Sequence, residues 1–463
     1  MSSGSTPGKK SFTCRNFILF PTGKQGLMRN GQPRRIEPLI DQLPRPNMNV
    51  YITGIAHTPL GRHPDLSVKQ LTEQAVNTAL ADSGHGLEDM QAAWFSNVRQ
   101  GQMEKQNSIR GQCALNAMGV SGIPVFNIEN ACASSSSGLF NACMAVESGM
   151  FDAVLVVGAE KMFYPDKKAE MMNAFFGGTD IHLLRQTWDF FCQQETDPGI
   201  RQRLNSPGAW NTQSFFMDIY AAMARQHMRT YGTTQRQIAS AAAKNHAHST
   251  MNPLAQYQND MSTDEVLATP EIAWPLTRAM CAPISDGAAA IVLSSGRALS
   301  DARRQRAVKV AGIGAASTVI RDIADMDRHC VHLAAKRAYA MAGITPQDID
   351  LAEVHDASSF AELLQIENLG LCARGQGGPY TESGATSLGG TTPVNVSGGL
   401  VSKGHPIAAT GLVQIHELVT QLRHEAGARQ VQGARTAVAE NGGGFLHYED
   451  AAAVVTVLSN RLY

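Results

Sequence analysis

Apolar and polar positions along this chain repeat a pattern in which a short apolar run precedes a helical run that ends at glycine. The apolar run at residues 50–55 predicts a strand, and residues 71–84 follow it with helical spacing. Residues 308–313 and 333–343 repeat the same order in the second half of the chain. Because strands alternate with helices in both places, we expect an α/β fold with two stacked sheets.

The two halves resemble each other closely enough to indicate a diverged internal repeat. Gly54 and Gly312 occupy matching places in the paired strands, and Gly84 and Gly343 end the paired helices. Chance likeness of strand–helix units is the alternative, and the shared order of the matches argues against it. Three further matches follow in that order: residues 89–97 with 348–355, 151–158 with 434–439, and 286–292 with 450–455.

The repeat and its interruption predict the domain organisation. Residues 48–160 together with 277–300 form the first half, and residues 306–463 form the second. The intervening residues 161–276 carry aromatic side chains and turn-rich pieces, so we interpret them as an inserted loop or lid subdomain that binds substrate.

Residues 1–47 form an N-terminal extension rich in Lys, Arg, Ser, Gly and Pro. We interpret it as a tail, as a targeting segment, or as an overlong start with Met48 as the first residue. Residues 35–43 loosely resemble an N-terminal peroxisomal signal. We expect a cytoplasmic location, or a peroxisomal or mitochondrial one if the extension is a targeting signal.

Composition narrows the function classes. The chain has 463 residues, 43% hydrophobic and 17% charged, which is typical of a soluble globular protein with a large core. The net charge is -1 and the sequence has no basic block, so nothing in its charge indicates nucleic-acid binding. No apolar run is long enough to span a membrane. Eight cysteines without a CxxC motif indicate a reducing compartment, and His246 and His248 lack further ligands for a metal site.

Cys132 is the first candidate for chemistry. It precedes a serine-rich turn, Gly138 and an apolar helical run at residues 139–146. A thiol just before a helix N-terminus feels the positive end of the helix dipole, so we expect a lowered pKa and a nucleophilic thiolate. The alternative is a buried structural cysteine, because free Cys is often only a small apolar side chain.

Two histidines downstream strengthen the catalytic interpretation. His355 ends an apolar strand pattern at the place where the first half has Asn97, and an imidazole there can donate a hydrogen bond or move a proton. His405 follows a glycine-rich loop that the repeat pairs with the Cys132 loop. A two-fold relation between the halves therefore brings Cys132 and His405 together, which is the arrangement of an activated nucleophile.

Several segments resemble the thiolase superfamily, and in particular the sterol carrier protein 2 type of 3-ketoacyl-CoA thiolase. The most specific are Glu353-Val354-His355-Asp356, residues 362–372 and residues 397–406. The resemblance covers the chain from about residue 50 onward. It implies a five-layer αβαβα sandwich of two repeated halves with an inserted lid, usually a homodimer, which uses acyl-CoA and no cofactor.

The resemblance also implies roles for single residues. Cys132 is the nucleophile that takes the acyl group as a thioester, and His405 deprotonates it and helps bind the thioester oxygen. His355 stands where most thiolases have asparagine and completes the first oxyanion hole through a water. The backbone N–H groups of Cys132 and Gly443 form the second oxyanion hole.

One part of the family's site is missing from this sequence. Thiolases use a second cysteine to move the α-proton of an acyl-CoA. Its place in the sterol carrier protein 2 type is Ala357, and its place in other thiolases is Asn441, in Asn441-Gly442-Gly443. With no thiol at either position, only His355 or His405 is left to move this proton, so we expect slow thiolysis.

The leading hypothesis is an acyl-CoA acyltransferase of lipid or acyl-CoA metabolism that performs 3-ketoacyl-CoA thiolysis or Claisen-type acyl transfer. One alternative is a retro-aldol lyase acting on a β-hydroxyacyl-CoA side chain. Another is a non-catalytic acyl-CoA-binding subunit of a complex. The expected partners are acyl-CoA and a second copy of the chain, with an accessory subunit as a further candidate. The acyl chain, the acceptor and the direction of reaction stay open.

Overall fold

The computed structural model describes residues 28–29, 32–33, 48–206 and 215–461. The chain divides into two units, Met1–Pro44 and Arg45–Tyr463. In the first unit, β1 (Met28–Arg29) pairs antiparallel with β2 (Gln32–Pro33). The rest of the predicted extension, with the possible targeting motif at residues 35–43, lies outside the described residues.

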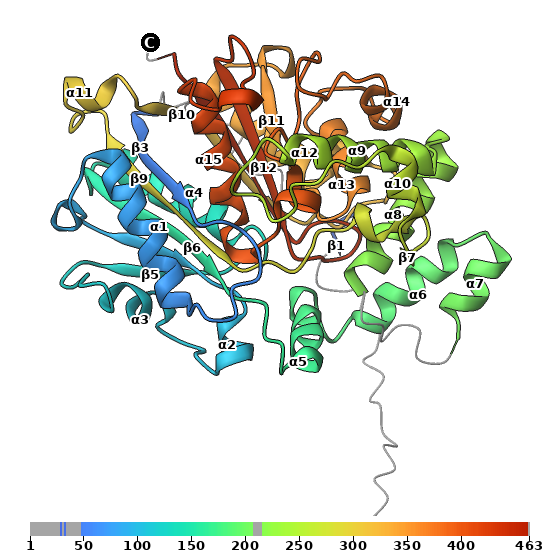
Figure 1. Ribbon diagram of the computed structural model, residues 1–463. Coiled ribbons are helices and arrows are strands. Elements are labelled where there is room, and N and C mark those ends of the chain that lie inside the picture. The colour runs from blue at the N-terminus through green and yellow to red at the C-terminus, as the bar shows by residue number, and fades with distance from the viewer. Residues whose placement is uncertain (1–27, 30–31, 34–47, 207–214, 462–463) are drawn as a thin grey trace, which may run out of the picture. The chain divides into compact units, whose positions relative to one another are not determined.

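The second unit is built on a nine-stranded sheet in the order β11-β12-β13-β10-β3-β9-β6-β4-β5 (Figure 1). The strands of the first half are β3 (Val50–His57), β4 (Ala93–Ser96), β5 (Val125–Ile128), β6 (Ala153–Glu160) and β9 (Gly287–Ser295). Those of the second half are β10 (Val308–Ser317), β11 (Leu351–Glu353), β12 (Thr436–Gly443) and β13 (Ala452–Ser459). Only two residue pairs, between β3 and β10, join the two halves of the sheet.

Helices cover both outer faces and fill the space between the halves. α4 (Ser134–Glu147) and α15 (Thr410–Leu422) share one apolar core with strands of both halves. α1 (Val68–Ser83) and α3 (Arg110–Asn116) cover the outer face of the first half, and α12 (Cys330–Ala342) covers that of the second. The predicted αβαβα sandwich is therefore confirmed, with the addition that its two sheets also touch at one edge.

The repeated glycines have a common steric cause. Gly54 and Gly312 each lie beside a register shift in their strand pairing. A Cβ atom at either position would collide with a carbonyl oxygen of the covering helix, that of Ala79 or Ala338. Only glycine lets the helix lie this close to the strand, and this is why the two positions match in the sequence.

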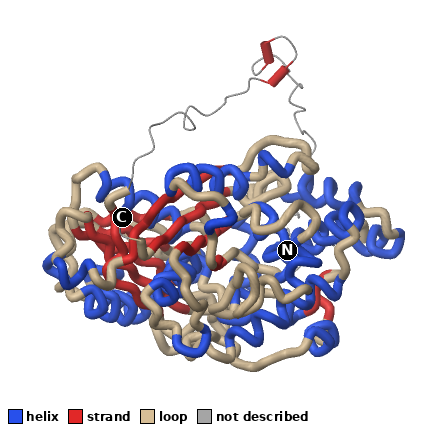
Figure 2. Tube along the Cα trace, turned by 90° about the horizontal axis from the view of Figure 1, so that it is seen from above, coloured by secondary structure: helices blue, strands red, loops and turns tan. Residues whose placement is uncertain are grey.

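The segment between β6 and β9 is mostly helical, and Figure 2 shows most of the sheet, with helices around it, in one part of the molecule and mainly helices and loops in the other. Its helices are α5 (Lys168–Asn173), α6 (Leu184–Gln194), α7 (Pro198–Leu204), α8 (Phe215–Tyr231), α9 (Gln235–Ser249) and α10 (Thr263–Ala268), followed by the hairpin β7 (Glu271–Ala273) and β8 (Leu276–Thr277). The remaining helices are α2 (Gln100–Glu104), α11 (Asp301–Arg304), α13 (Ser359–Asn368) and α14 (Gly377–Glu382). None of the helices in the described ranges is long and apolar enough to cross a membrane.

A pair of histidines in the middle layer makes stability depend on pH. The rings of His57 on β3 and His416 on α15 meet edge to face at 4.5 Å. Burial lowers the pKa of His57 from 6.5 to about 4. At pH 5 the unfolded chain binds a proton there that the folded chain does not, so this contribution to stability is present above pH 6.5 and is lost as the pH falls. The loss is about 2 kcal/mol at pH 5 for one such group.

We expect His57→Asn to reduce the difference in unfolding free energy between pH 7 and pH 5 by about this amount, about 2 kcal/mol. Urea denaturation at the two pH values measures it. An unchanged difference in the variant would show that His57 is not one of the groups that take up protons on unfolding.

Candidate active site

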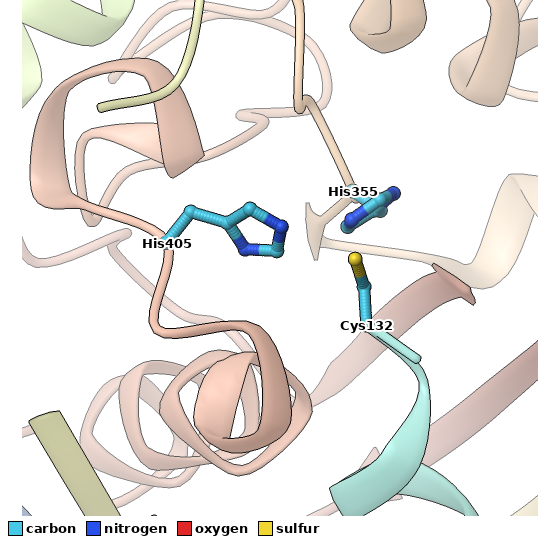
Figure 3. Close-up of side chains that lie close together, drawn as sticks. All are labelled: Cys132, His355 and His405. Carbon is cyan, nitrogen blue, oxygen red and sulfur yellow. The ribbon is translucent and has the colours of Figure 1, made fainter. Parts of the chain in front are cut away.

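Three predicted residues from distant parts of the chain meet at one point. The Cys132 Sγ and ring nitrogens of His355 and His405 all lie within 4.8 Å of one another (Figure 3). Cys132 lies between β5 and α4, His355 follows β11, and His405 follows a π-helical turn at Gly399–Lys403. The juxtaposition that the repeat predicted is present, while the catalytic roles of the three residues stay predictions.

A strained turn presents Cys132. Its neighbour Ala131 adopts a positive φ of 48°, which is costly for a residue other than glycine and is found mostly at functional sites. The Ser134 hydroxyl stabilises the turn by donating to the Ala131 carbonyl at 2.6 Å and accepting from the Asn130 N–H at 2.9 Å. Ser134, two residues after Cys132, thus holds both sides of the turn.

The expected low pKa of Cys132 is wrong for this unliganded site. Burial raises the pKa of the thiol to about 12, against the opposing effects of the Arg99 charge and of a hydrogen bond from the Gly444 N–H. The desolvation of a thiolate in this low-dielectric site outweighs the helix dipole. Cys132 is therefore a thiol at neutral pH, and the nucleophilic role predicted for it would require a base.

The hydrogen bonds of His405 leave one ring nitrogen free to act as that base. Its Nδ1 lies 2.7 Å from the Thr410 Oγ1, and the Thr410 hydroxyl donates to the Pro406 carbonyl at 3.1 Å. The Nδ1 therefore carries the hydrogen and donates it to Thr410, which leaves a lone pair on Nε2. Burial lowers the pKa of His405 well below its usual value, so the ring is neutral and can accept a proton.

His355 is held by its backbone rather than by its ring. Its N–H donates to the Glu440 Oε2 at 2.9 Å. Both ring nitrogens lack a hydrogen-bond partner among the described residues, although the residue is only 2% exposed. Burial lowers its pKa to about 4, so the ring is neutral. Buried polar atoms nearly always have partners, and the unpartnered ring of His355 is consistent with a substrate atom or water as the missing one.

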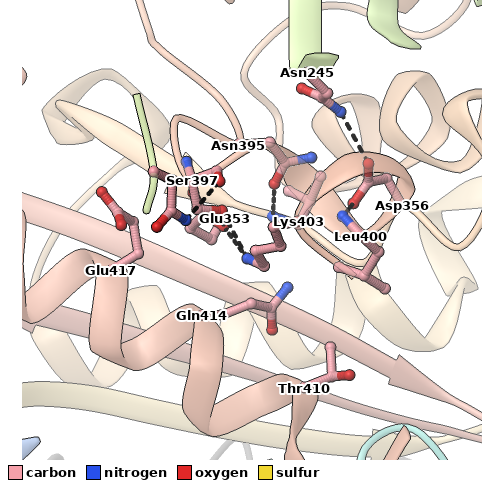
Figure 4. A network of polar contacts seen from close by, with 12 residues as sticks. Asn245, Glu353, Asp356, Asn395, Ser397, Leu400, Lys403, Thr410, Gln414 and Glu417 are labelled. Atoms are coloured by element: carbon pink, nitrogen blue, oxygen red, sulfur yellow. Dashed lines mark hydrogen bonds and ion pairs between the residues drawn. The ribbon is translucent and has the colours of Figure 1, made fainter. Parts of the chain in front are cut away.

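A buried polar network ties the two histidine segments together (Figure 4). Lys403, two residues before His405, forms an ion pair with Glu353, two residues before His355, at 2.7 Å. Ser397 donates to the same carboxylate at 2.5 Å and accepts from Lys403 at 2.7 Å. The network therefore connects the two chain segments that carry His355 and His405.

Breaking this pair tests its structural importance. Glu353→Gln leaves the Lys403 ammonium, 1% exposed, without a counter-ion, and we expect a loss of about 3–5 kcal/mol in unfolding free energy. Asp264→Asn is the matched control, because the Arg236–Asp264 pair lies at the surface and exposed pairs contribute little. Equal effects of the two variants in urea denaturation would contradict this view of the network.

The three side chains open into a cavity of about 690 Å³. Ala357, one of the two places for a second thiol, lines this cavity. Asn441, the other place, does not line it and instead accepts a hydrogen bond from the Ser136 hydroxyl at 2.7 Å. A thiol restored at residue 357 would therefore face substrate, and one at residue 441 would not.

The predicted oxyanion donor Gly443 ends β12 beside Ala133, where a Cβ atom would lie 2.5 Å from the Ala133 nitrogen. The next residue, Gly444, lines the cavity and directs its N–H to the Cys132 sulfur. The role of Gly443 stays a prediction. Gly444 is a further candidate donor, and the run of three glycines at residues 442–444 was the available signal for it.

Other histidines have structural hydrogen bonds. His248 hydrogen bonds through Nδ1 to the Asn395 carbonyl at 3.0 Å and accepts from the Leu388 N–H through Nε2 at 3.0 Å. His329, near Cys330 and Glu449, accepts the Val331 N–H through Nδ1 at 3.2 Å. The hydrogen of His329 then lies on Nε2, the atom facing Glu449, so this cluster lacks the lone pair that a metal ion requires there.

Comparison with known proteins agrees with the resemblance in the sequence. Residues 50–297 match the family described as thiolase, N-terminal domain, and residues 312–460 match thiolase C-terminal domain-like. Acetyl-CoA acetyltransferase of Methanothermobacter thermautotrophicus is 36% identical over 86% of this chain and 96% of that protein. Human sterol carrier protein 2 is 34% identical over 85% and 69% of the two chains, and benzoylsuccinyl-CoA thiolase subunit BbsB of Thauera aromatica is 30% identical over 83% and 91%.

Solved structures show the same fold at lower sequence identity. The Ltp2-ChsH2(DUF35) aldolase matches with a TM-score of 0.68 and 22% identity over 89% of this chain and 98% of that one. Human mitochondrial 3-ketoacyl-CoA thiolase in complex with CoA matches with a TM-score of 0.61 and 16% identity over 89% and 97%.

Proposed function

The chain belongs to the thiolase family, and on this premise we propose that it transfers acyl groups from coenzyme A thioesters through a thioester on Cys132. The observation that carries the proposal is the meeting of one thiol and two neutral imidazoles within 4.8 Å at the wall of a cavity. The chemistry needs no cofactor, because thiol, imidazole and backbone N–H groups supply it.

In the proposed reaction, Cys132 Sγ attacks the thioester carbonyl while its proton passes to the Nε2 of His405. The carbonyl oxygen becomes negative, and donors from the His355 ring and from the backbone at Cys132 and Gly443 or Gly444 stabilise it. The C–S bond to coenzyme A then breaks, and the leaving thiolate takes the proton from His405. Each such oxyanion donor contributes about 3 kcal/mol.

Acyl exchange between coenzyme A molecules tests this half-reaction alone. We expect the purified chain, mixed with an acyl-CoA and isotope-labelled CoA, to produce the labelled acyl-CoA. This readout needs no carbon–carbon bond chemistry, so it does not depend on the second thiol. Failure to exchange any acyl group across a series of thioesters would contradict the proposed function.

The missing thiol affects only one of the two steps of a thiolase reaction, the cleavage or formation of the carbon–carbon bond. Thiolysis of a 3-ketoacyl-CoA also needs a group that carries the α-proton, and Ala357 cannot do so. We expect Ala357→Cys to raise thiolysis of acetoacetyl-CoA or a longer 3-ketoacyl-CoA at least tenfold, which is about 1.4 kcal/mol of barrier. Asn441→Cys is the control that brings no gain, because residue 441 does not line the cavity. Wild-type thiolysis in the ordinary thiolase range, unchanged by Ala357→Cys, would show that a histidine suffices.

A retro-aldol lyase is the second candidate function, and the similarity to the Ltp2-ChsH2(DUF35) aldolase fold supports it. The retention of Cys132 with both histidines favours acyl transfer instead. The name of BbsB, a thiolase subunit, supports an accessory partner protein, and we also propose a homodimer. A cytoplasmic location, or a peroxisomal or mitochondrial one directed by residues 1–47, remains part of this proposal.

A further inference from the structure

Arg99 is a buried cation in the wall of the cavity that holds Cys132. It lies between β4 and α2 and is 5% exposed. Its Nη1 donates to the Gln102 Oε1 at 3.1 Å and to the Ala174 carbonyl, and its guanidinium lies 4.8 Å from the centre of the Phe175 ring. Its Nε and Nη2 have no hydrogen-bond acceptor in the described parts of the chain.

Burial lowers the pKa of this guanidinium and the smaller effects of Glu160 and Glu129 raise it, but no carboxylate of the described residues lies in direct contact with it. Glu160 is nearby, but its oxygens accept hydrogen bonds from the Asn97 side chain and from the backbone N–H groups of Val98 and Arg99. Cys132 does not balance the charge either, because its raised pKa keeps it neutral. Glu160 therefore balances the Arg99 charge only from a distance, and the guanidinium edge that lacks an acceptor is left for a group from outside the chain.

The surroundings of Arg99 make it distinctive within the cavity. Two other arginines of the lining, Arg62 and Arg278, are exposed and therefore lie at its opening. The wall that the inserted segment contributes is largely apolar and includes Met172, Phe175, Phe215, Phe216, Met217 and Tyr220. A single cation in such a wall selects for a ligand that is apolar apart from one anionic group.

The internal repeat pairs Arg99 with a position of the second half that also belongs to the site. Asn97 matches His355 in the repeat, so Arg99 matches Ala357, the place of the missing thiol. Both residues line the cavity beside Cys132. The chain therefore has a cation at one of the two symmetry-related positions and lacks the thiol at the other.

We propose that Arg99 binds a carboxylate carried by the acyl group, so that the preferred substrates are coenzyme A thioesters whose acyl group bears a second acid group. A guanidinium binds a carboxylate through two parallel hydrogen bonds, and Nε and Nη2 form one edge of that fork. This inference rests on the proposed function, because it concerns the acyl group that Cys132 accepts.

The experiment compares matched thioesters in the exchange assay. Each ω-carboxyacyl-CoA from succinyl-CoA to suberyl-CoA is paired with the unsubstituted acyl-CoA of the same chain length. We expect at least one carboxylated member to have a kcat/KM at least tenfold above its partner. This comparison uses the wild-type chain, so it stands even if a variant fails to fold. Wild-type exchange without a preference for any carboxylated member overturns the inference and leaves the proposed function intact, whereas no exchange at all overturns both.

Arg99→Gln then assigns the preference to this residue. We expect it to remove the tenfold advantage of the carboxylated thioester over its unsubstituted partner, beyond the loss that both members share because the Arg99 charge lowers the pKa of Cys132, with Arg99→Lys retaining part of the advantage. Arg62→Gln is the control, since an arginine at the opening affects both members of a pair equally. Equal losses on both members in Arg99→Gln would mean that Arg99 supports Cys132 rather than a carboxylate, and would overturn the inference.

Discussion

Replacing Cys132 by alanine abolishes acyl exchange between coenzyme A thioesters, with a loss of at least about 10⁴-fold. Within the described ranges, Cys132 is the thiol that lies within 4.8 Å of both His355 and His405. Without its sulfur no acyl-enzyme forms, and the oxyanion donors have no intermediate to stabilise. Exchange of a label between acyl-CoA and free CoA, followed by mass spectrometry, measures the loss.

Cys281 provides the matched control for this prediction. It lines the same cavity, but its Sγ donates to the Thr277 carbonyl at 3.4 Å and it is not part of the cluster with the two imidazoles. Burial raises its pKa to about 12, as at Cys132. We expect Cys281→Ala to keep most of the exchange activity. The opposite result, with activity in Cys132→Ala and none in Cys281→Ala, would show that Cys281 is the nucleophile.

Replacing His405 by alanine slows acyl transfer about 10²–10⁴-fold, the usual effect of removing a general base. The Cys132 thiol has a pKa raised to about 12 by burial, so its attack at neutral pH depends on a base in place. His405 offers an Nε2 lone pair, fixed by the Nδ1 contact to Thr410. Alkylation of Cys132 by iodoacetamide at pH 7 should slow in parallel.

The pH dependence of alkylation distinguishes a base from a structural residue. In His405→Ala, thiolate forms only by direct ionisation, so the alkylation rate should rise tenfold per pH unit below the pKa of about 12. His355→Ala should affect alkylation less, because His355 is assigned to the oxyanion. If wild type and His405→Ala react at the same rate at pH 7, His405 is not the base.

The fold and the proximity of Cys132 to His405 could be predicted, because both follow from the internal repeat of the sequence. Gly54 and Gly312 are forced by the same close approach of helix to strand, so the sequence retains the match. The two-fold relation that follows places the Cys132 and His405 loops together without any knowledge of side-chain contacts. The pairing of β3 with β10 was not predictable, because an apolar pattern identifies a strand but not its neighbour across an edge.

The electrostatics of the site could not be predicted from the sequence. The helix dipole favours a thiolate at Cys132, but burial decides the sign of the pKa shift, and the local sequence does not show how deeply the thiol is buried in the folded chain. Arg99 was missed for a related reason, since a charged residue three positions after the end of a strand is most often exposed. Its match to Ala357 in the repeat was the signal that pointed to the cavity.

The measurement that tests the central claim most directly is the location of the acyl group on the protein. The chain is incubated with an acyl-CoA that supports exchange, quenched in acid, digested and mapped by mass spectrometry. We expect one acyl group on the peptide that contains Cys132, removed by neutral hydroxylamine as expected of a thioester. An unmodified protein at saturating acyl-CoA, or an acyl group on any residue other than Cys132, would contradict it.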